Sequence, residues 1–174
     1  MIVTKIEITP YLAEYLTGKF YDPESDAVRI PDTKDLYHTI WDLMSKRPGN
    51  AIDTGNLSLV LPDRRMGKDP EYYNYLGERS AHIIDKRVRV MFYAELHDRL
   101  DENKHRYNIE YIDTVHHFMC KYNITSISED GLLKNYYRWR DNERKKKAKR
   151  DYKKKLNTLW FITDIAYGFV RSKR

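Results

Sequence analysis

The 174-residue sequence contains a single cysteine, Cys120, and this scarcity excludes two classes of small protein. One thiol cannot build an intrachain disulfide framework, and it cannot supply a zinc site made from a cluster of cysteines. Cys120 lies in an apolar stretch of a predicted helix, so we expect it to be a core residue rather than a nucleophile. The residue pattern predicts no metal site and no cofactor.

Long apolar runs are also missing. The most apolar segment, residues 156–170, is fifteen residues long and contains Asp164, whereas a helix that spans a bilayer needs about 20 apolar residues. The first six residues lack the basic start and the apolar stretch of a signal peptide. We therefore expect a cytoplasmic protein without a membrane span.

Motifs that would indicate catalysis are absent from the sequence. The seven glycines are scattered and form no phosphate-cradling loop. His116 and His117 are adjacent in a predicted helix, where their side chains point about 100° apart and cannot chelate one ion together. No predicted strand carries an acid-x-Lys pair that would hold Mg²⁺ in a nuclease. We expect a non-enzymatic protein with no catalytic residue and no small-molecule substrate, since an enzyme would need an acid or histidine cluster that the linear sequence does not show.

Acidic residues are scarce in the C-terminal part, which polarises the charge of the chain. The formal net charge is +6, but residues 144–174 carry twelve Lys and Arg against Asp151 and Asp164, a net charge of +10. The preceding 143 residues carry a net charge of −4. Such a basic block attracts polyanions, nucleic acid first and anionic membrane second. The alternative is a solvated helix face without a fixed partner.

The N-terminal third alternates short strands and helices. We expect the first helix to begin at Thr9-Pro10 and to stop at Gly18. Asp32 or Thr33 should cap the second helix, whose apolar face would carry Leu36, Ile40, Trp41 and Met44. The expected strands are Ile2–Ile8, Ala27–Ile30 and Asn56–Leu61. This pattern predicts a small α+β region over residues 1–63, with about three short strands and two helices.

The remainder of the chain, residues 70–174, has a helical period. We take the exposed, mostly basic loop 63–69 as the boundary between the two regions. The expected elements are a helix from Pro70 interrupted near Gly77, a long helix from Glu78 to about Leu100, a polar break at Asp101–Tyr107, and a helix from Ile109 to Tyr122. The fold class is therefore α+β and predominantly helical.

Residues 109–155 carry a helix-turn-helix-like pattern in a generic sense. Ser126 and Glu129 have the spacing of a capping box, which predicts that a second helix begins there and runs through Lys155. The connection of about eight residues, Asn123–Asp130, is longer than the usual tight turn, so a plain helical hairpin is an open alternative. In the second helix four side chains should pack inward: Leu132, Leu133, Tyr136 and Tyr137.

The outward side chains of this second helix are our candidate DNA contacts. Lys, Arg and Asn can pair with guanine and adenine edges in a major groove, and a basic run can hold phosphates. The expected groove contacts are Lys134, Asn135, Arg138 and Arg140. The expected phosphate contacts are Arg144, Lys145, Lys146, Lys147, Lys149, Arg150, Lys153, Lys154 and Lys155.

The apolar segment 156–170 should form a helix that docks on a body, either its own core or a second subunit. Its apolar face would carry Leu159, Ile162, Ala166 and Phe169. We therefore predict a non-enzymatic DNA-binding protein, such as a transcriptional regulator or an accessory replication or recombination factor of a phage or mobile element, with homo-oligomer contacts through this helix. The competing hypothesis is an assembly protein whose basic helix is a solvated face or contacts RNA or other anions.

Overall fold

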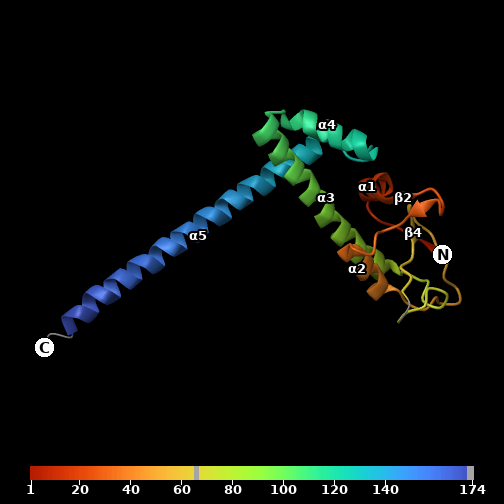
Figure 1. The fold of residues 1–174 in the computed structure, drawn as a ribbon, viewed down its shortest axis with the longest axis horizontal. Helices are drawn as coiled ribbons and strands as arrows, with labels where there is room; N and C mark the ends of the chain where they lie inside the picture. Colours follow the sequence, from red (N-terminus) through yellow and green to blue (C-terminus); the bar gives the residue numbers. More distant parts are fainter. Residues whose placement is uncertain (65–66, 172–174) are drawn as a thin grey trace. The chain divides into compact units, whose positions relative to one another are not determined.

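The computed structural model describes residues 1–64 and 67–171, with side chains up to residue 155, and it confirms the α+β, predominantly helical fold class. The chain divides into two compact units, Met1–Asp130 and Gly131–Arg174. The proposed division into regions 1–63 and 70–174 stays a prediction. In chain order the elements are β1 (Val3–Ile6), α1 (Pro10–Phe20), β2 (Tyr21–Asp22), β3 (Ala27–Val28), α2 (Asp35–Leu43), β4 (Leu57–Val60), α3 (Glu78–Tyr107), α4 (Tyr111–Tyr122) and α5 (Glu129–Arg171) (Figure 1).

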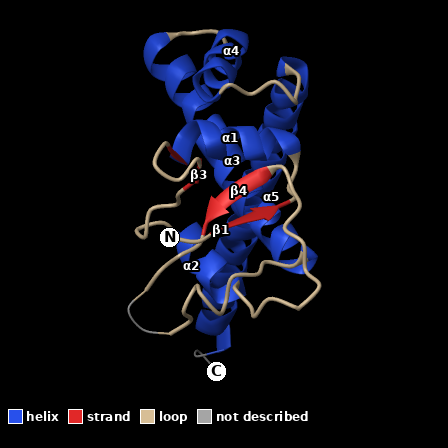
Figure 2. Ribbon diagram, turned by 90° about the vertical axis from the view of Figure 1, so that its right-hand side faces the viewer, coloured by secondary structure: helices blue, strands red, loops and turns tan. Residues whose placement is uncertain are grey.

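The sheet has four short strands in the order β1-β4-β3-β2. Strands β1 and β4 are antiparallel and lie side by side, with Val3 opposite Val60 (Figure 2). Strand β3 is parallel to β4 through the pair Val28 and Leu59, and β2 is antiparallel to β3. The three expected strands are confirmed with shorter bounds. Strand β2 was not predicted, because a strand of two residues has no alternation that a sequence pattern can show.

Helix α1 begins at Pro10 as expected, but it does not stop at Gly18. The helix continues to Phe20. Gly18 instead allows the backbones of α1 and α4 to lie close together. A Cβ atom at Gly18 would lie 2.6 Å from the carbonyl oxygen of Tyr122 and 2.8 Å from its Cα. Real Cβ atoms are essentially never this close to a backbone, so only glycine fits where α1 meets the end of α4.

Two predicted helix starts were wrong. The residue that precedes α2 is Lys34 rather than Asp32 or Thr33. The N–H of Lys34 donates to the carbonyl of Pro31 at 3.1 Å, so this stretch forms a turn before the helix begins. Pro70 starts only a turn, because the chain that follows it pairs with an earlier segment. The backbones of Ser45 and Tyr75 exchange hydrogen bonds of 3.1 and 3.2 Å, which need extended rather than helical geometry.

Helix α3 is longer than the sequence indicated, since the expected polar break at 101–107 is helical. Leu100 is completely buried at this point, and Glu102 pairs with Arg106 at 2.7 Å along the helix. The helix ends where Asn108 adopts the left-handed conformation, with φ 54°. Asparagine is one of the few residues that tolerate this conformation, so a local stop signal, not the polar stretch, terminates α3.

The core of the first unit forms around α3, which contacts α1, α2 and α4 (Figure 1). Its buried apolar side chains recur about every fourth residue, as an amphipathic helix requires. Phe92 is completely buried at the centre of an aromatic cluster, where its ring meets those of Tyr15 at 5.2 Å and Phe118 at 5.5 Å. The buried residues of this face are Ala81, Ile84, Val88, Phe92, Leu96 and Leu100.

One half-buried carboxylate ties three helices together beside this cluster. Glu95 of α3 accepts hydrogen bonds from Tyr15 Oη at 2.6 Å and Lys19 Nζ, both on α1, and from Tyr122 Oη on α4. Burial by itself raises the pKa of Glu95, but the hydrogen bonds from Lys19, Tyr122 and Tyr15 outweigh it and lower the pKa to about 2. The sequence pattern did not single out Glu95, because its partners come from two other helices, so this cluster was missed.

Candidate nucleic-acid interface

The segment that leads into α5 is held by one acidic side chain of α1. The Glu14 carboxylate accepts the backbone N–H groups of Thr125 and Ser126 at 2.9 and 3.1 Å. It also accepts both hydroxyl groups, at 3.0 Å from Thr125 and 2.5 Å from Ser126. The predicted capping box was therefore wrong: α5 begins at Glu129, which makes residue 128 its N-cap position, and the Ser126 hydroxyl is bound to Glu14.

The first turns of α5 partly match the predicted inward face. Leu132 and Tyr136 are completely buried and Leu133 is half-buried, as expected. Tyr137 was predicted to point inward, but it is 47% exposed. The reason is helix geometry: one residue turns a helix by about 100°, so Tyr137 cannot share the direction of Tyr136. The ring of Tyr136 instead stacks with Trp139 at 5.9 Å.

The structure places all thirteen predicted DNA-contact residues on α5, with different exposure. Lys134 and Arg138 are exposed, whereas Asn135 and Arg140 are half-buried. Arg140 is also engaged in an interaction of its own, so it is the weakest of the four groove candidates. The predicted phosphate contacts are all exposed: Arg144, Lys145, Lys146, Lys147, Lys149, Arg150, Lys153, Lys154 and Lys155.

Helical periodicity gathers some of these side chains into a stripe. At about 100° per residue, seven basic or amide side chains fall within about 100° of arc on one side of α5. No acidic residue of the helix up to residue 155 falls in the same sector. With a rise of about 1.5 Å per residue the stripe is roughly 28 Å long. This basic stripe consists of Lys134, Asn135, Arg138, Asn142, Lys145, Lys149 and Lys153.

Two acidic residues of α5, Asp141 and Glu143, pair with basic residues outside the stripe. Lys146 contacts Glu143 at 2.7 Å, and Arg144 lies 3.8 Å from Asp141. The hydrogen bond from Lys146 lowers the pKa of Glu143. Among the residues whose side chains the structure describes, no acid lies within ion-pair distance of the five cations of the stripe. The stripe therefore presents unneutralised positive charge along one face.

A groove of about 1060 Å³ beside β1 and the start of α3 is the other candidate site. Its lining mixes both signs of charge, with Lys5, Glu78 and His82 among its residues. The buried carboxylate in it, Asp85, accepts the N–H of Thr9 at 2.8 Å and an Arg89 N–H at 2.9 Å. Burial raises the pKa of Asp85, but the hydrogen bonds from Thr9 and Arg89 lower it overall. Asp85 is thus used to fix the start of α1.

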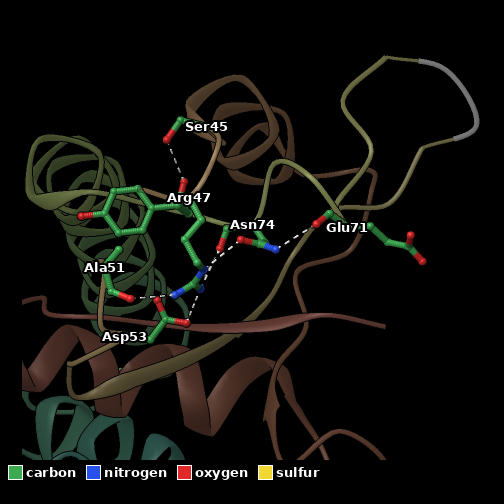
Figure 3. A network of polar contacts seen from close by, with 7 residues as sticks. Ser45, Arg47, Ala51, Asp53, Glu71 and Asn74 are labelled. Atoms are coloured by element: carbon green, nitrogen blue, oxygen red, sulfur yellow. Dashed lines mark hydrogen bonds and ion pairs between the residues drawn. The ribbon is translucent and has the colours of Figure 1, made fainter. Parts of the chain in front are cut away.

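A polar network near this groove is also structural (Figure 3). Arg47 donates to Asp53 at 2.6 Å, to Asn74 Oδ1 at 3.0 Å and to the carbonyl of Ala51 at 3.4 Å. Asn74 in turn donates to the carbonyl of Glu71 at 3.0 Å. The guanidinium group of Arg47 therefore links residues 45–53 to 71–75.

One basic residue of the loop 63–69, Lys68, is less available than the sequence suggested. Lys68 is half-buried, and its ammonium group donates to the carbonyls of Trp41 at 3.2 Å, Asp42 at 2.5 Å and Met44 at 2.8 Å. These carbonyls are at the end of α2, where the helix dipole favours a cation. Lys68 thus stabilises the end of a helix.

The prediction that Cys120 is a core residue was wrong, because its side chain is exposed. The buried face of α4 carries Val115, Phe118 and Tyr122. Cys120 lies two residues from both Phe118 and Tyr122, about 200° round the helix from each, and so points away from that face. An apolar sequence neighbourhood alone could not show this, but the helical phase of the three buried residues could.

None of the helices that the structure describes is long and apolar enough to cross a membrane. Within the described part of the chain, no group of three His, Cys, Asp or Glu side chains is arranged to hold a metal ion. Comparisons of the sequence with protein-family models and with curated proteins gave no match, and neither did a comparison with solved structures. The chemistry of the described residues therefore carries the functional argument.

Proposed function

We propose that this chain is a non-enzymatic, cytoplasmic DNA-binding protein that contacts the duplex with the basic stripe of α5. The observation that carries the proposal is the stripe itself: five exposed cations on one face, with no acidic residue in the same sector of the described helix. Cations arranged in this way contact successive phosphates, and most non-specific affinity for DNA comes from such contacts.

The start of the stripe is the part suited to base contacts. Arg138 is exposed, and Asn135 lies about 60° from it round the helix, so both face the same sector. Arginine pairs with guanine and asparagine with adenine in a major groove. Since Asn135 is half-buried, Arg138 is the stronger candidate of the two. We place the protein with transcriptional regulators or with accessory replication and recombination factors of a phage or mobile element.

The test compares two variants with the same loss of charge. In the stripe variant Arg138, Lys145, Lys149 and Lys153 are changed to Gln. In the control variant four cations from the opposite side of α5 are changed to Gln: Arg144, Lys147, Lys154 and Lys155. Binding to a labelled duplex of random sequence is measured from low to moderate salt.

We expect the stripe variant to lose most of its affinity and the control variant to lose much less. Each lost phosphate contact lowers the slope of log affinity against log salt by about 0.9, so the slope should fall by about 3 to 4 in the stripe variant. Equal losses in the two variants would show that only total charge matters. No binding by the unmodified protein at low salt would refute the proposal.

An assembly function is the second candidate, and exposed aromatic side chains on α5 favour it. Tyr137 is 47% exposed and Tyr152 is 66% exposed, and exposed aromatic residues are typical of protein interfaces. The apolar face expected at residues 156–170, proposed for dimerisation, lies outside the described side chains. Light scattering of the unmodified protein and of a Tyr137→Ser, Tyr152→Ser variant would test this function. Dissociation of an oligomer in the variant, with no DNA binding by either protein, would favour assembly.

A further inference from the structure

Three side chains of the first unit form a thiol, imidazole and carboxylate series at the surface. Cys120 and His116 are one turn apart on α4, and Sγ lies 3.6 Å from His116 Nε2. The other ring nitrogen, Nδ1, lies 2.8 Å from Oε1 of Glu129. Cys120 is exposed, and the side chains of His116 and Glu129 are 62% and 37% exposed. A solvent-borne reagent can therefore reach the sulfur.

The hydrogen bonds assign a role to each ring nitrogen. A carboxylate can only accept, so the Glu129 contact places the ring hydrogen on Nδ1 and leaves the lone pair of Nε2 facing the thiol. In this arrangement His116 can take the proton of Cys120 while the sulfur attacks, and Glu129 stabilises the imidazolium that forms. Cys120 is in the last turn of α4, and a thiol is a weak nucleophile until a base takes its proton. The neighbouring base is therefore needed to activate this thiol.

We propose that Cys120, His116 and Glu129 form a reactive-thiol site that reacts stoichiometrically with disulfides. The Cys120 sulfur attacks one sulfur of the disulfide, forming a new S–S bond, and the thiolate of the other half leaves. The Cys120 proton passes to His116 Nε2 and then to the leaving thiolate. One thiol and one disulfide thus become one mixed disulfide and one free thiol, so atoms and electrons balance without another reagent.

The open surroundings favour a disulfide over an acyl substrate. Cys120 lies outside the groove beside β1 and outside the smaller hollow beside α1. Acyl transfer needs aligned donors for a developing oxyanion. Disulfide exchange requires only access to the sulfur along the S–S axis and a proton acceptor. This inference does not depend on DNA binding, since Cys120, His116 and Glu129 all lie outside the basic stripe.

The test measures how fast Cys120 reacts with 4,4′-dithiodipyridine, a neutral disulfide, at neutral pH. Cys120 is the single thiol of the chain, so the thiopyridone released reports this site alone. The rate of the folded protein is compared with that of the same chain in denaturant, with N-acetylcysteinamide in both solvents as the correction. His116→Gln and Glu129→Gln test the assigned roles, and His117→Gln is the matched control, since His117 is exposed and points about 100° away.

We expect the folded protein to react at least ~10-fold faster than the unfolded chain, and His116→Gln to remove that excess, because a positioned base contributes at least this much. Glu129→Gln should lower the rate by a smaller factor, and His117→Gln should leave it unchanged. Oxidised glutathione should form a mixed disulfide at Cys120, detected by mass spectrometry. A folded protein that reacts no faster than the unfolded chain would overturn the proposal. Equal rates for His116→Gln and His117→Gln would do the same.

Discussion

Replacing Glu95 by Gln tests whether the half-buried carboxylate of α3 holds α1 and α4 in place. Gln has nearly the same shape and keeps one accepting oxygen, but it removes the negative charge that Lys19 contacts. The side chains of Lys19 and Glu95 are 25% and 20% exposed, so neither is fully screened by water. The variant leaves the Lys19 ammonium half-buried without its partner, a situation that is costly in proteins.

The lowered pKa of Glu95 gives the size of its contribution to the free energy of unfolding. It falls from 4.5 to about 2, and each unit corresponds to about 1.4 kcal/mol, so the charged form contributes about 3 kcal/mol to folding near neutral pH. Because the pKa is lower in the folded protein than in the unfolded chain, this contribution is complete above pH 4.5. It is lost as the pH falls toward about 2.

Urea unfolding from pH 7 down to pH 2.5 would measure this contribution. We expect Glu95→Gln to lower the free energy of unfolding by about 3 kcal/mol at pH 7 and to flatten its fall below pH 4.5. Glu102→Gln is the control, because Glu102 is 46% exposed in its pair with Arg106 and should cost less than about 1 kcal/mol. Equal losses in the two variants, or an unchanged acid dependence in Glu95→Gln, would refute the reasoning.

Two further substitutions test contacts that bring α1 against the end of α4. Gly18→Ala would place a Cβ atom 2.6 Å from the Tyr122 carbonyl oxygen and should destabilise the protein by about 1–3 kcal/mol in thermal unfolding. Gly49→Ala, where a Cβ atom meets nothing within 4 Å, should be close to neutral. Glu14→Gln weakens four hydrogen bonds to residues 125–126, so amide exchange there should quicken at constant pH, by about fivefold for each kcal/mol that is lost. Unchanged exchange would contradict the role given to Glu14. The Glu14 hydrogen bonds outweigh burial and lower its pKa, so in the unmodified protein the protection factors of these amides, which correct for intrinsic exchange at each pH, should fall as the pH drops below 4.5.

The parts of the fold that the sequence predicted are those with local causes. The start of α1 follows from Thr9-Pro10, and the buried face of α3 follows from apolar residues with a helical period. The predicted helix stop at Gly18 failed because its glycine is needed for contact with Tyr122, a residue more than a hundred positions away. The predicted helix at Pro70 failed for a similar reason, since pairing with Ser45 extends that part of the chain.

The basic stripe and the Cys120 site differ in the same way, since the first has local causes and the second depends on contacts between distant segments. The sequence by itself determined the basic stripe, because spacing along one continuous helix sets which side chains share a face, and Lys134, Arg138 and Lys145 need no other element to align them. Only the tertiary structure decided the partners of Glu95 and of His116. Glu95 meets Tyr15 and Glu129 meets His116 because folding packs separate segments together, and no local spacing encodes such contacts.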